Sequence, residues 1–278
     1  MSEFSTKNVG RYVRAGAIGV RNILWGGSLA ALTMGNMRRF LGAATENLFF
    51  ARTYGNGRSL VQKNVFEVFP LGGGVASITL ANLDRPWCAY GEPWFHTVAS
   101  YASDIVSLCL LTKAIRPRVI FEIGTFRGYT ALHFALNSDP QATVHSLDLP
   151  REGPFSPALT TTVTDGHISS TGRGVRQYVF EGYEAAHKIR CLYGDSATFD
   201  FTPFKNSVDL FFIDGAHSYD YVRSDTLKAL ECVVPGGAIV WHDFGRVGEN
   251  GVTRWLTEFA QGREVYCVPG SSVAFMKA

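Results

Sequence analysis

Acidic and imidazole side chains follow two apolar runs in the C-terminal half of the chain. The run that begins at Asp209 delivers Asp214 and, three residues later, His217, and a later run delivers the adjacent pair His242 and Asp243. If these runs are neighbouring parallel strands, their carboxyl ends place all four side chains at one edge of a sheet. Such a group could remove a proton or bind a divalent ion. The alternative is that the acids cap loops and the histidines form local hydrogen bonds.

A glycine turn follows an earlier apolar run, Val119–Gly124, which carries Glu122 near its end. Thr125 and Gly128 lie in this turn, whose Gly-x-x-x-Gly spacing differs from the Gly-x-Gly-x-x-Gly of dinucleotide pyrophosphate sites. The spacing favours an adenosyl ligand that has no phosphate, such as S-adenosylmethionine, with Glu122 facing its cationic amino-acid end. Alternatively, Glu122 caps a helix and the glycines form only a tight turn.

Further acids end the next two apolar runs. Asp148 lies 20 residues beyond Gly128, where a carboxylate can accept hydrogen bonds from both ribose hydroxyls. Asp195, followed by Ser196, could read the adenine edge or simply cap a helix. The residues predicted to bind the cofactor are Glu122, Gly124, Thr125, Gly128, Tyr129, Asp148, Leu149, Asp195, Ser196 and Asp214.

Apolar runs alternate with amphipathic stretches from residue 96 onward, which predicts a parallel sheet with helices on both faces. The expected strands are Val119–Gly124, Thr143–Asp148, Ile189–Tyr193, Val208–Asp214, Ala238–His242 and a C-terminal antiparallel hairpin over residues 265–276. The expected helices cover residues 96–115, 129–137, 219–232 and 251–261. We therefore expect a Rossmann-like α/β fold with a seven-stranded, mostly parallel sheet in residues 96–278.

Two regions fall outside this alternation. Residues 1–95 are expected to form an N-terminal appendage that serves oligomerisation or covers the substrate pocket. Within it, Ile23–Met37 is too short to span a bilayer and is expected to form a buried, interfacial or oligomer-forming helix. The polar segment Pro150–Glu184 interrupts the alternation beside the expected ligand edge, which is typical of a lid.

The composition is that of a soluble globular protein, with 46% hydrophobic and 18% charged residues. A net charge of +2 provides no strong attraction for nucleic acid, and five scattered cysteines without a Cys-x-x-Cys pair suit the reducing cytoplasm. The expected partners are a small-molecule acceptor and further copies of the chain, with no stable membrane span.

The order and spacing of these motifs resemble class I S-adenosylmethionine-dependent methyltransferases, in the branch called methyltransferase family 24, which is similar to catechol and caffeoyl-CoA O-methyltransferases. The resemblance covers residues 96–278 and rests on the motifs at residues 121–125, 146–148, 193–196, 212–219 and 235–243. It implies O-methylation of a small molecule, as in small-molecule biosynthesis. By the resemblance, Asp214 and Asp243 are ligands of a divalent metal such as Mg or Mn, and His217 replaces a lysine that acts as general base.

The chain departs from this pattern at the third metal ligand. The resemblance expects an asparagine after Asp243, and Phe244 stands there. His242 could complete the ligand set for a softer ion such as zinc or manganese, or no metal binds and His217 forms the base with Asp243. Two other functions remain open from the residues alone: a nicotinamide-dependent oxidoreductase and a non-catalytic adenosyl-binding scaffold.

Overall fold

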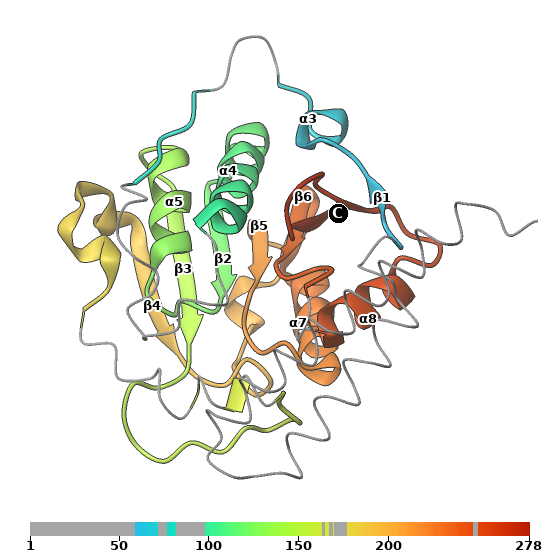
Figure 1. Ribbon diagram of the computed structural model, residues 1–278. Coiled ribbons are helices and arrows are strands. Elements are labelled where there is room, and N and C mark those ends of the chain that lie inside the picture. The colour runs from blue at the N-terminus through green and yellow to red at the C-terminus, as the bar shows by residue number, and fades with distance from the viewer. Residues whose placement is uncertain are drawn as a thin grey trace, which may run out of the picture.

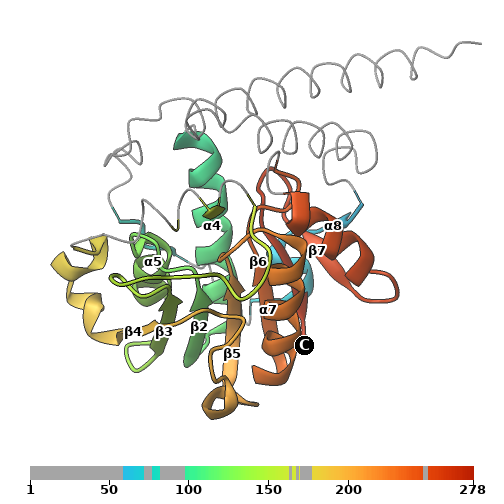
Figure 2. The same ribbon diagram turned by 90° about the horizontal axis from the view of Figure 1, so that it is seen from below.

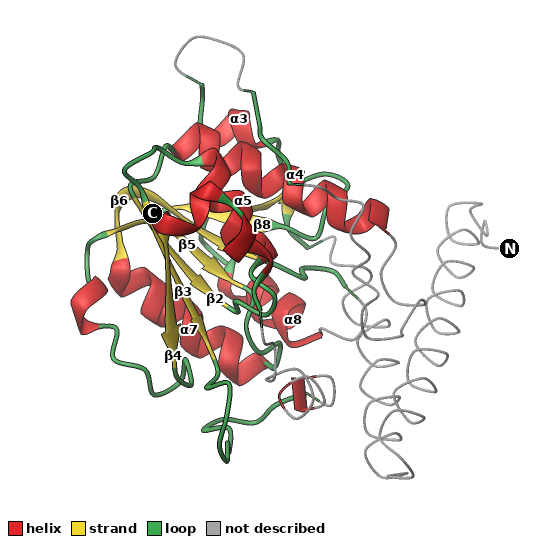
Figure 3. Ribbon diagram, turned by 90° about the vertical axis from the view of Figure 1, so that its left-hand side faces the viewer, coloured by secondary structure: helices red, strands yellow, loops and turns green. Residues whose placement is uncertain are grey.

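The computed structural model describes residues 59–71, 77–81, 98–162, 165–166, 169, 177–246 and 250–278. The segment Ile23–Met37 lies outside the described residues, as does most of the expected appendage. In the described part, helices lie on both sides of a single twisted sheet (Figures 1 and 3). None of the helices in these residues is long and apolar enough to cross a membrane.

Eight strands form the sheet, in the order β1-β7-β8-β6-β5-β2-β3-β4. They are β1 (Val61–Gln62), β2 (Val119–Ile123), β3 (Thr143–Asp148), β4 (Ile189–Tyr193), β5 (Val208–Ile213), β6 (Val233–Trp241), β7 (Val265–Cys267) and β8 (Ala274–Lys277). β2 to β6 pair in parallel, whereas β8 is antiparallel between β6 and β7. The predicted sheet with its C-terminal antiparallel hairpin is confirmed, and β1 adds an eighth strand.

The helices connect these strands and cover both faces of the sheet. They are α3 (Val65–Val68), α4 (Val98–Ile115), α5 (Tyr129–Asn137), α7 (Tyr219–Cys232) and α8 (Asn250–Phe259), with 3-10 turns η1 (Val179–Gly182), η2 (Glu184–Lys188) and η3 (Thr202–Phe204). α7 and α8 lie side by side against one face (Figures 1 and 2). The strand order reverses between β2 and β5, which is where open α/β sheets form a crevice at their carboxyl ends.

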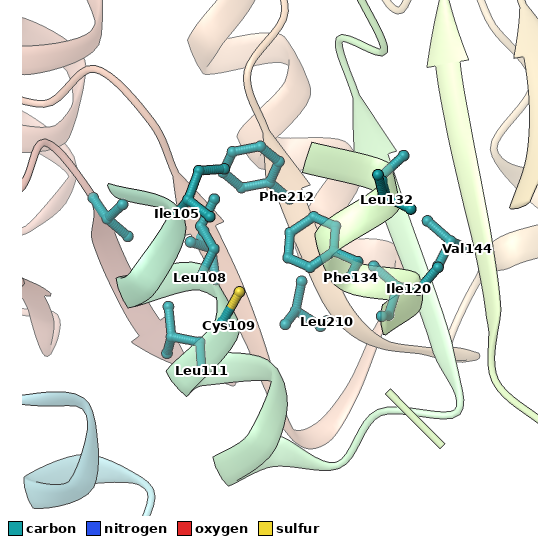
Figure 4. Packing of buried hydrophobic residues seen from close by; sticks show 14 of the residues in the cluster. Ile105, Leu108, Cys109, Leu111, Ile120, Leu132, Phe134, Val144, Leu210 and Phe212 are labelled. Atoms are coloured by element: carbon teal, nitrogen blue, oxygen red, sulfur yellow. The ribbon is translucent and has the colours of Figure 1, made fainter. Parts of the chain in front are cut away.

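Successive residues of the central strands face opposite cores, so these strands are apolar on both sides. Ile120 and Phe212 point to the core under α4 and α5 (Figure 4). In this core the ring centroids of Phe134 and Phe212 lie 5.4 Å apart. Phe121 and Phe211 point to the other core, under α7 and α8, and their rings stack at 4.9 Å. Burial on both faces explains why the strands read as continuous apolar runs.

Residues 59–71 and 77–81 of the expected appendage pack onto the sheet domain. Val65, Phe69 and Ala81 are buried in the α4–α5 core. The side chain of Asn137 exchanges hydrogen bonds of 2.8 Å with the backbone of Thr79. These residues therefore contribute to the core of the domain that follows them.

β6 begins at Val233, five residues before the predicted start at Ala238. The intervening Pro-Gly-Gly sequence lies within the strand as an irregularity, with a register shift against β5 between Val208 and Leu210. Prolines and glycines within strands commonly mark such bulges.

Candidate active site

Two glycines shape the turn between β2 and α5. Gly124 has φ of 101°, and a Cβ atom there would overlap the backbone oxygen of Asp214. Gly128 has φ of 78°, and a Cβ atom there would overlap the ring of Phe180. Only glycine combines these backbone angles with such close packing, so Gly124 brings the turn against the end of β5 and Gly128 brings it against η1.

Glu122 is completely buried at the carboxyl end of β2. It accepts a hydrogen bond from the hydroxyl of Ser146 on β3, and the Ser146 and Thr125 hydroxyls lie 2.6 Å apart. Burial raises the pKa of Glu122 to about 8, and the carboxylates of Asp214 and Asp148 add to the rise. Among the described residues, no group hydrogen-bonds Oε1 of Glu122, which leaves one buried acceptor for a ligand.

Asp148 ends β3 beside the glycine turn. Its two carboxylate oxygens accept the backbone amides of Phe126 and Leu149, each at 2.7 Å. Burial raises the pKa of Asp148, although these amides and Arg151 oppose the rise. The half-buried carboxylate thus fixes the turn and remains at the crevice.

Asp195 follows β4 and is bound from three directions. Its Oδ1 accepts the amide of Ala197, while Oδ2 accepts the amide of Ala158 at 2.9 Å and the hydroxyl of Tyr221 at 2.8 Å. Ser196 is buried next to it. Asp195 therefore caps the next turn at the carboxyl end of β4, and its second oxygen binds the insertion through Ala158.

His217 lies at the carboxyl edge beyond β5, between carboxylates on both ring nitrogens. Nδ1 is 2.7 Å from Oδ1 of Asp165, and Nε2 is 3.1 Å from Oδ2 of Asp243 and 3.8 Å from Oδ1 of Asp214. Asp165 belongs to the insertion Pro150–Glu184. An imidazole with a carboxylate on its rear nitrogen is suited to exchange a proton, or bind an ion, through the other nitrogen.

His242 also has carboxylates at both ring nitrogens, and it shares two of them, Asp214 and Asp243, with His217. Its Nε2 lies 3.2 Å from Oδ2 of Asp104 on α4, and its Nδ1 lies 3.1 Å from Asp214 and from Asp243. Burial opposes the charged imidazole, but the carboxylates of Asp214, Asp243 and Asp104 hold the pKa of His242 well above its ordinary value. The ring is therefore cationic at neutral pH.

Asp243 is the most heavily paired acid of the edge. Its φ of 61° is rare for a residue with a side chain, and Nε of Arg246 lies 2.8 Å from its Oδ1. Burial opposes ionisation, yet His242 and Arg246 hold the pKa of Asp243 well below its ordinary value. The carboxylate is ionised throughout the neutral range.

One atom each of Asp214, His217 and Asp243 lies within 4.8 Å of the other two, close enough to share a divalent ion. Phe244 is buried in the α7–α8 core and offers no ligand. The donors are two carboxylates with an imidazole from His217 or His242, a mixed oxygen and nitrogen set that fits manganese or zinc better than magnesium.

The structure brings together at one edge most of the residues that the sequence indicated: Glu122, Gly124, Thr125, Gly128, Asp148, Leu149, Asp195, Ser196, Asp214, His217, His242 and Asp243. Tyr129 differs, because its ring is buried in the core against His133. Sequence reasoning missed Asp104 and Asp165, the acids behind the two histidines. Asp104 had one signal, since it is the only acid in the apolar helix α4.

Residues 121–244 match a family model described as a methyltransferase domain. No curated protein matches the chain. Among solved structures, it is similar to the O-methyltransferase TomG of Streptomyces achromogenes, involved in tomaymycin synthesis and solved with S-adenosylmethionine (21% identity, 67% of this chain and 82% of that chain, TM-score 0.41). It is also similar to an O-methyltransferase of Bacillus cereus solved with S-adenosylhomocysteine (18% identity, 69% and 86% of the two chains, TM-score 0.44).

The strand order is that of an open α/β sheet with a switch point between β2 and β5. The family match shows that residues 121–244 are similar to a methyltransferase domain, over a little under half of the chain.

Proposed function

We propose that the protein is an S-adenosylmethionine-dependent methyltransferase that transfers a methyl group to a hydroxyl oxygen of a small molecule, with His217 as general base. S-adenosylmethionine, when bound, supplies the electrophilic methyl group. The observation that carries the proposal is the position of Nε2 of His217 at the carboxyl edge, beside Asp214 and Asp243. Among the described residues, the free buried oxygen of Glu122 fits the cationic end of the cofactor.

The residues around the crevice divide the work between binding and proton transfer. Glu122 would bind the amino-acid end, Asp148 the ribose hydroxyls, and Asp195 with Ser196 the adenine edge. His217 would accept the acceptor's hydroxyl proton at Nε2 while the acceptor oxygen forms its bond to the methyl carbon and the bond from that carbon to sulfur breaks. Alignment of the two reactants can remove on the order of 7 to 11 kcal/mol of the barrier.

A divalent ion would be held by Asp214 and Asp243 together with His242. It would polarise the acceptor hydroxyl and so make its proton easier to remove. The ion must compete with the proton that His242 carries in its present surroundings, because a metal ligand has to be deprotonated. His217 lies close to the same acids, so the base and the ion would act on one acceptor oxygen.

A transfer assay tests the proposal. The wild-type protein is incubated with methyl-labelled S-adenosylmethionine and a panel of phenols, catechols and aliphatic alcohols, and labelled products are separated by chromatography. His217→Ala should lower turnover by about a hundredfold or more, the usual contribution of a general base, while the cofactor Kd changes little in calorimetry. His187→Ala, at an exposed histidine of η2, is the control. Loss of cofactor binding in His217→Ala would contradict the base assignment.

A further inference from the structure

The acid behind His217 comes from the insertion between β3 and β4, outside the strands and helices that build the sheet. A single carboxylate, that of Asp165, reaches two groups of His217. Its Oδ1 is 2.7 Å from the ring Nδ1, and its Oδ2 accepts the backbone amide of the same residue at 2.9 Å. Ring and backbone are thereby held together by a residue 52 positions away in the chain.

Asp165 is itself fixed in place. The amide of Thr162 donates to its Oδ2 at 3.2 Å, and its own amide donates to the Thr162 hydroxyl at 3.1 Å. The residue is only 7% exposed. Its Oδ2 accepts two backbone amides, those of Thr162 and His217, which is the hydrogen-bonding pattern of a carboxylate. The second oxygen, Oδ1, faces Nδ1 of His217.

The protonation of the ring follows from this contact. A carboxylate can only accept hydrogen bonds, so a hydrogen bond to Asp165 requires a proton on Nδ1 of His217. Any proton that the ring gains or loses is then the one on Nε2, the nitrogen that faces Asp214 and Asp243. Nε2 also faces a carboxylate, that of Asp243 at 3.1 Å, so the neutral ring has a choice of two partners for its one proton. The contact with Asp165 is shorter, at 2.7 Å, and favours Nδ1. Without Asp165, the neutral imidazole would place its proton on Nε2 and would be unable to accept another there.

We propose that Asp165 is a positioning residue that keeps the proton of neutral His217 on Nδ1 and so directs proton exchange to Nε2. The proposal rests on the proposed function in one respect, the use of His217 as base. It gives the insertion a definite role: the segment supplies the group that prepares the histidine, and the sheet supplies the acids it faces.

The test compares Asp165→Asn with wild type by ¹⁵N nuclear magnetic resonance of protein labelled at histidine. In the variant, the side-chain oxygen of Asn is expected to accept the backbone N–H of His217, as Oδ2 of Asp165 does in wild type. The side-chain NH₂ of Asn then faces Nδ1 of His217. Because this NH₂ group donates a hydrogen bond, it favours an unprotonated Nδ1. The chain has seven histidines, and His217→Gln identifies the signal. At a pH where the ring is neutral, wild type should show the Nδ1-protonated form and Asp165→Asn the Nε2-protonated form or a mixture. An unchanged form would overturn the proposal.

Turnover gives a second reading. On the acceptor found by the transfer assay, kcat of Asp165→Asn should fall about a hundredfold while the cofactor Kd stays within about threefold. Asp200→Asn, at an exposed acid that caps Thr202, is the matched control. Thr162→Val keeps the Asp165 carboxylate but removes the hydroxyl that accepts the Asp165 amide, so an intermediate loss of kcat is expected. Full activity in both Asp165→Asn and Thr162→Val would refute the positioning role of Asp165. If wild type binds no cofactor, the proposed function fails, whereas the resonance experiment still decides the role of Asp165.

Discussion

Ser146 lies opposite Glu122 in the register of β3 and β2, and its hydroxyl donates a hydrogen bond to the Glu122 carboxyl group. Burial, reinforced by Asp214 and Asp148, still raises the pKa of Glu122 to about 8. In the ligand-free protein Glu122 is therefore mainly neutral at pH 7. A cationic ligand favours the ionised carboxylate, so its binding should release a proton.

The affinity for S-adenosylmethionine should accordingly rise with pH until about pH 8 and then level off, by at most tenfold per pH unit, because one proton is released. Calorimetry in two buffers of different ionisation enthalpy measures the proton directly. Glu122→Gln should bind more weakly, with no pH dependence from this group and no proton release. Equal proton release in wild type and Glu122→Gln would show that another group is responsible.

Asp148→Ala should weaken cofactor binding by about tenfold or more, since the ribose hydroxyls lose a charged acceptor. It should also lower the free energy of unfolding by about 1 to 3 kcal/mol, because the amides of Phe126 and Leu149 lose their partner. Asp139→Ala is the matched control, because Asp139 also accepts a backbone amide, that of Gln141, but at the opposite end of β3. Equal cofactor Kd values in the two variants would remove Asp148 from the site.

Asp214 and Asp243 should bind Mn²⁺, as measured by calorimetry or by the loss of the free-ion signal in electron paramagnetic resonance. Asp243→Asn should weaken this binding at least tenfold, and asparagine is a suitable replacement because it tolerates the positive φ. His217→Ala should retain the ion if His217 is the base, whereas His242→Ala should lose it. Mn²⁺ binding that disappears in His217→Ala would make His217 a ligand instead.

Asp225, fully buried in α7, should make the protein less stable as the pH rises. Burial raises its pKa to about 7, although Ser196 and Lys228 oppose the rise. The folded state thus holds this proton more tightly than the unfolded state, so the contribution of Asp225 to stability is fully present below about pH 4 and is lost as the pH rises to about 7.

Asp225→Asn removes this pH dependence. When the pH is raised from 5 to 8, the free energy of unfolding of the variant should therefore increase relative to that of wild type. Each unit of pKa shift corresponds to about 1.4 kcal/mol, so the relative gain is at most a few kcal/mol. Denaturant unfolding at both pH values measures it, with Asp220→Asn on the exposed side of the same helix as control. The same wild-type-to-variant difference at pH 5 and pH 8 would contradict the prediction.

The fold was predictable because its signals are local. β3, β4, α5 and α7 have the predicted bounds. β3 ends in Asp148, β4 is followed by Gly194, α5 is followed by Ser138, and α7 is preceded by Ser218. β6 was predicted too short, because its Pro-Gly-Gly sequence is typical of a turn and only pairing with β5 makes it part of a strand.

The site was predictable where the sheet itself positions the residue. Glu122, Asp148 and Asp214 end parallel strands, so their meeting follows from topology alone. Asp165 and Asp104 reach the histidines across 52 and 138 positions of sequence, from an irregular segment and from a covering helix. Such contacts depend on tertiary packing, and no local pattern specifies them.

β1 has a consequence for how two copies of this chain could meet. It pairs in parallel with β7 at Val61 and Gln62, and the amide of Lys63 continues the ladder to Cys267. The backbone groups that β7 would otherwise offer to a neighbour are already bonded. A second molecule would therefore meet β1 at this border, and β1 is only two residues long, which leaves little edge for continuous strand pairing between two copies.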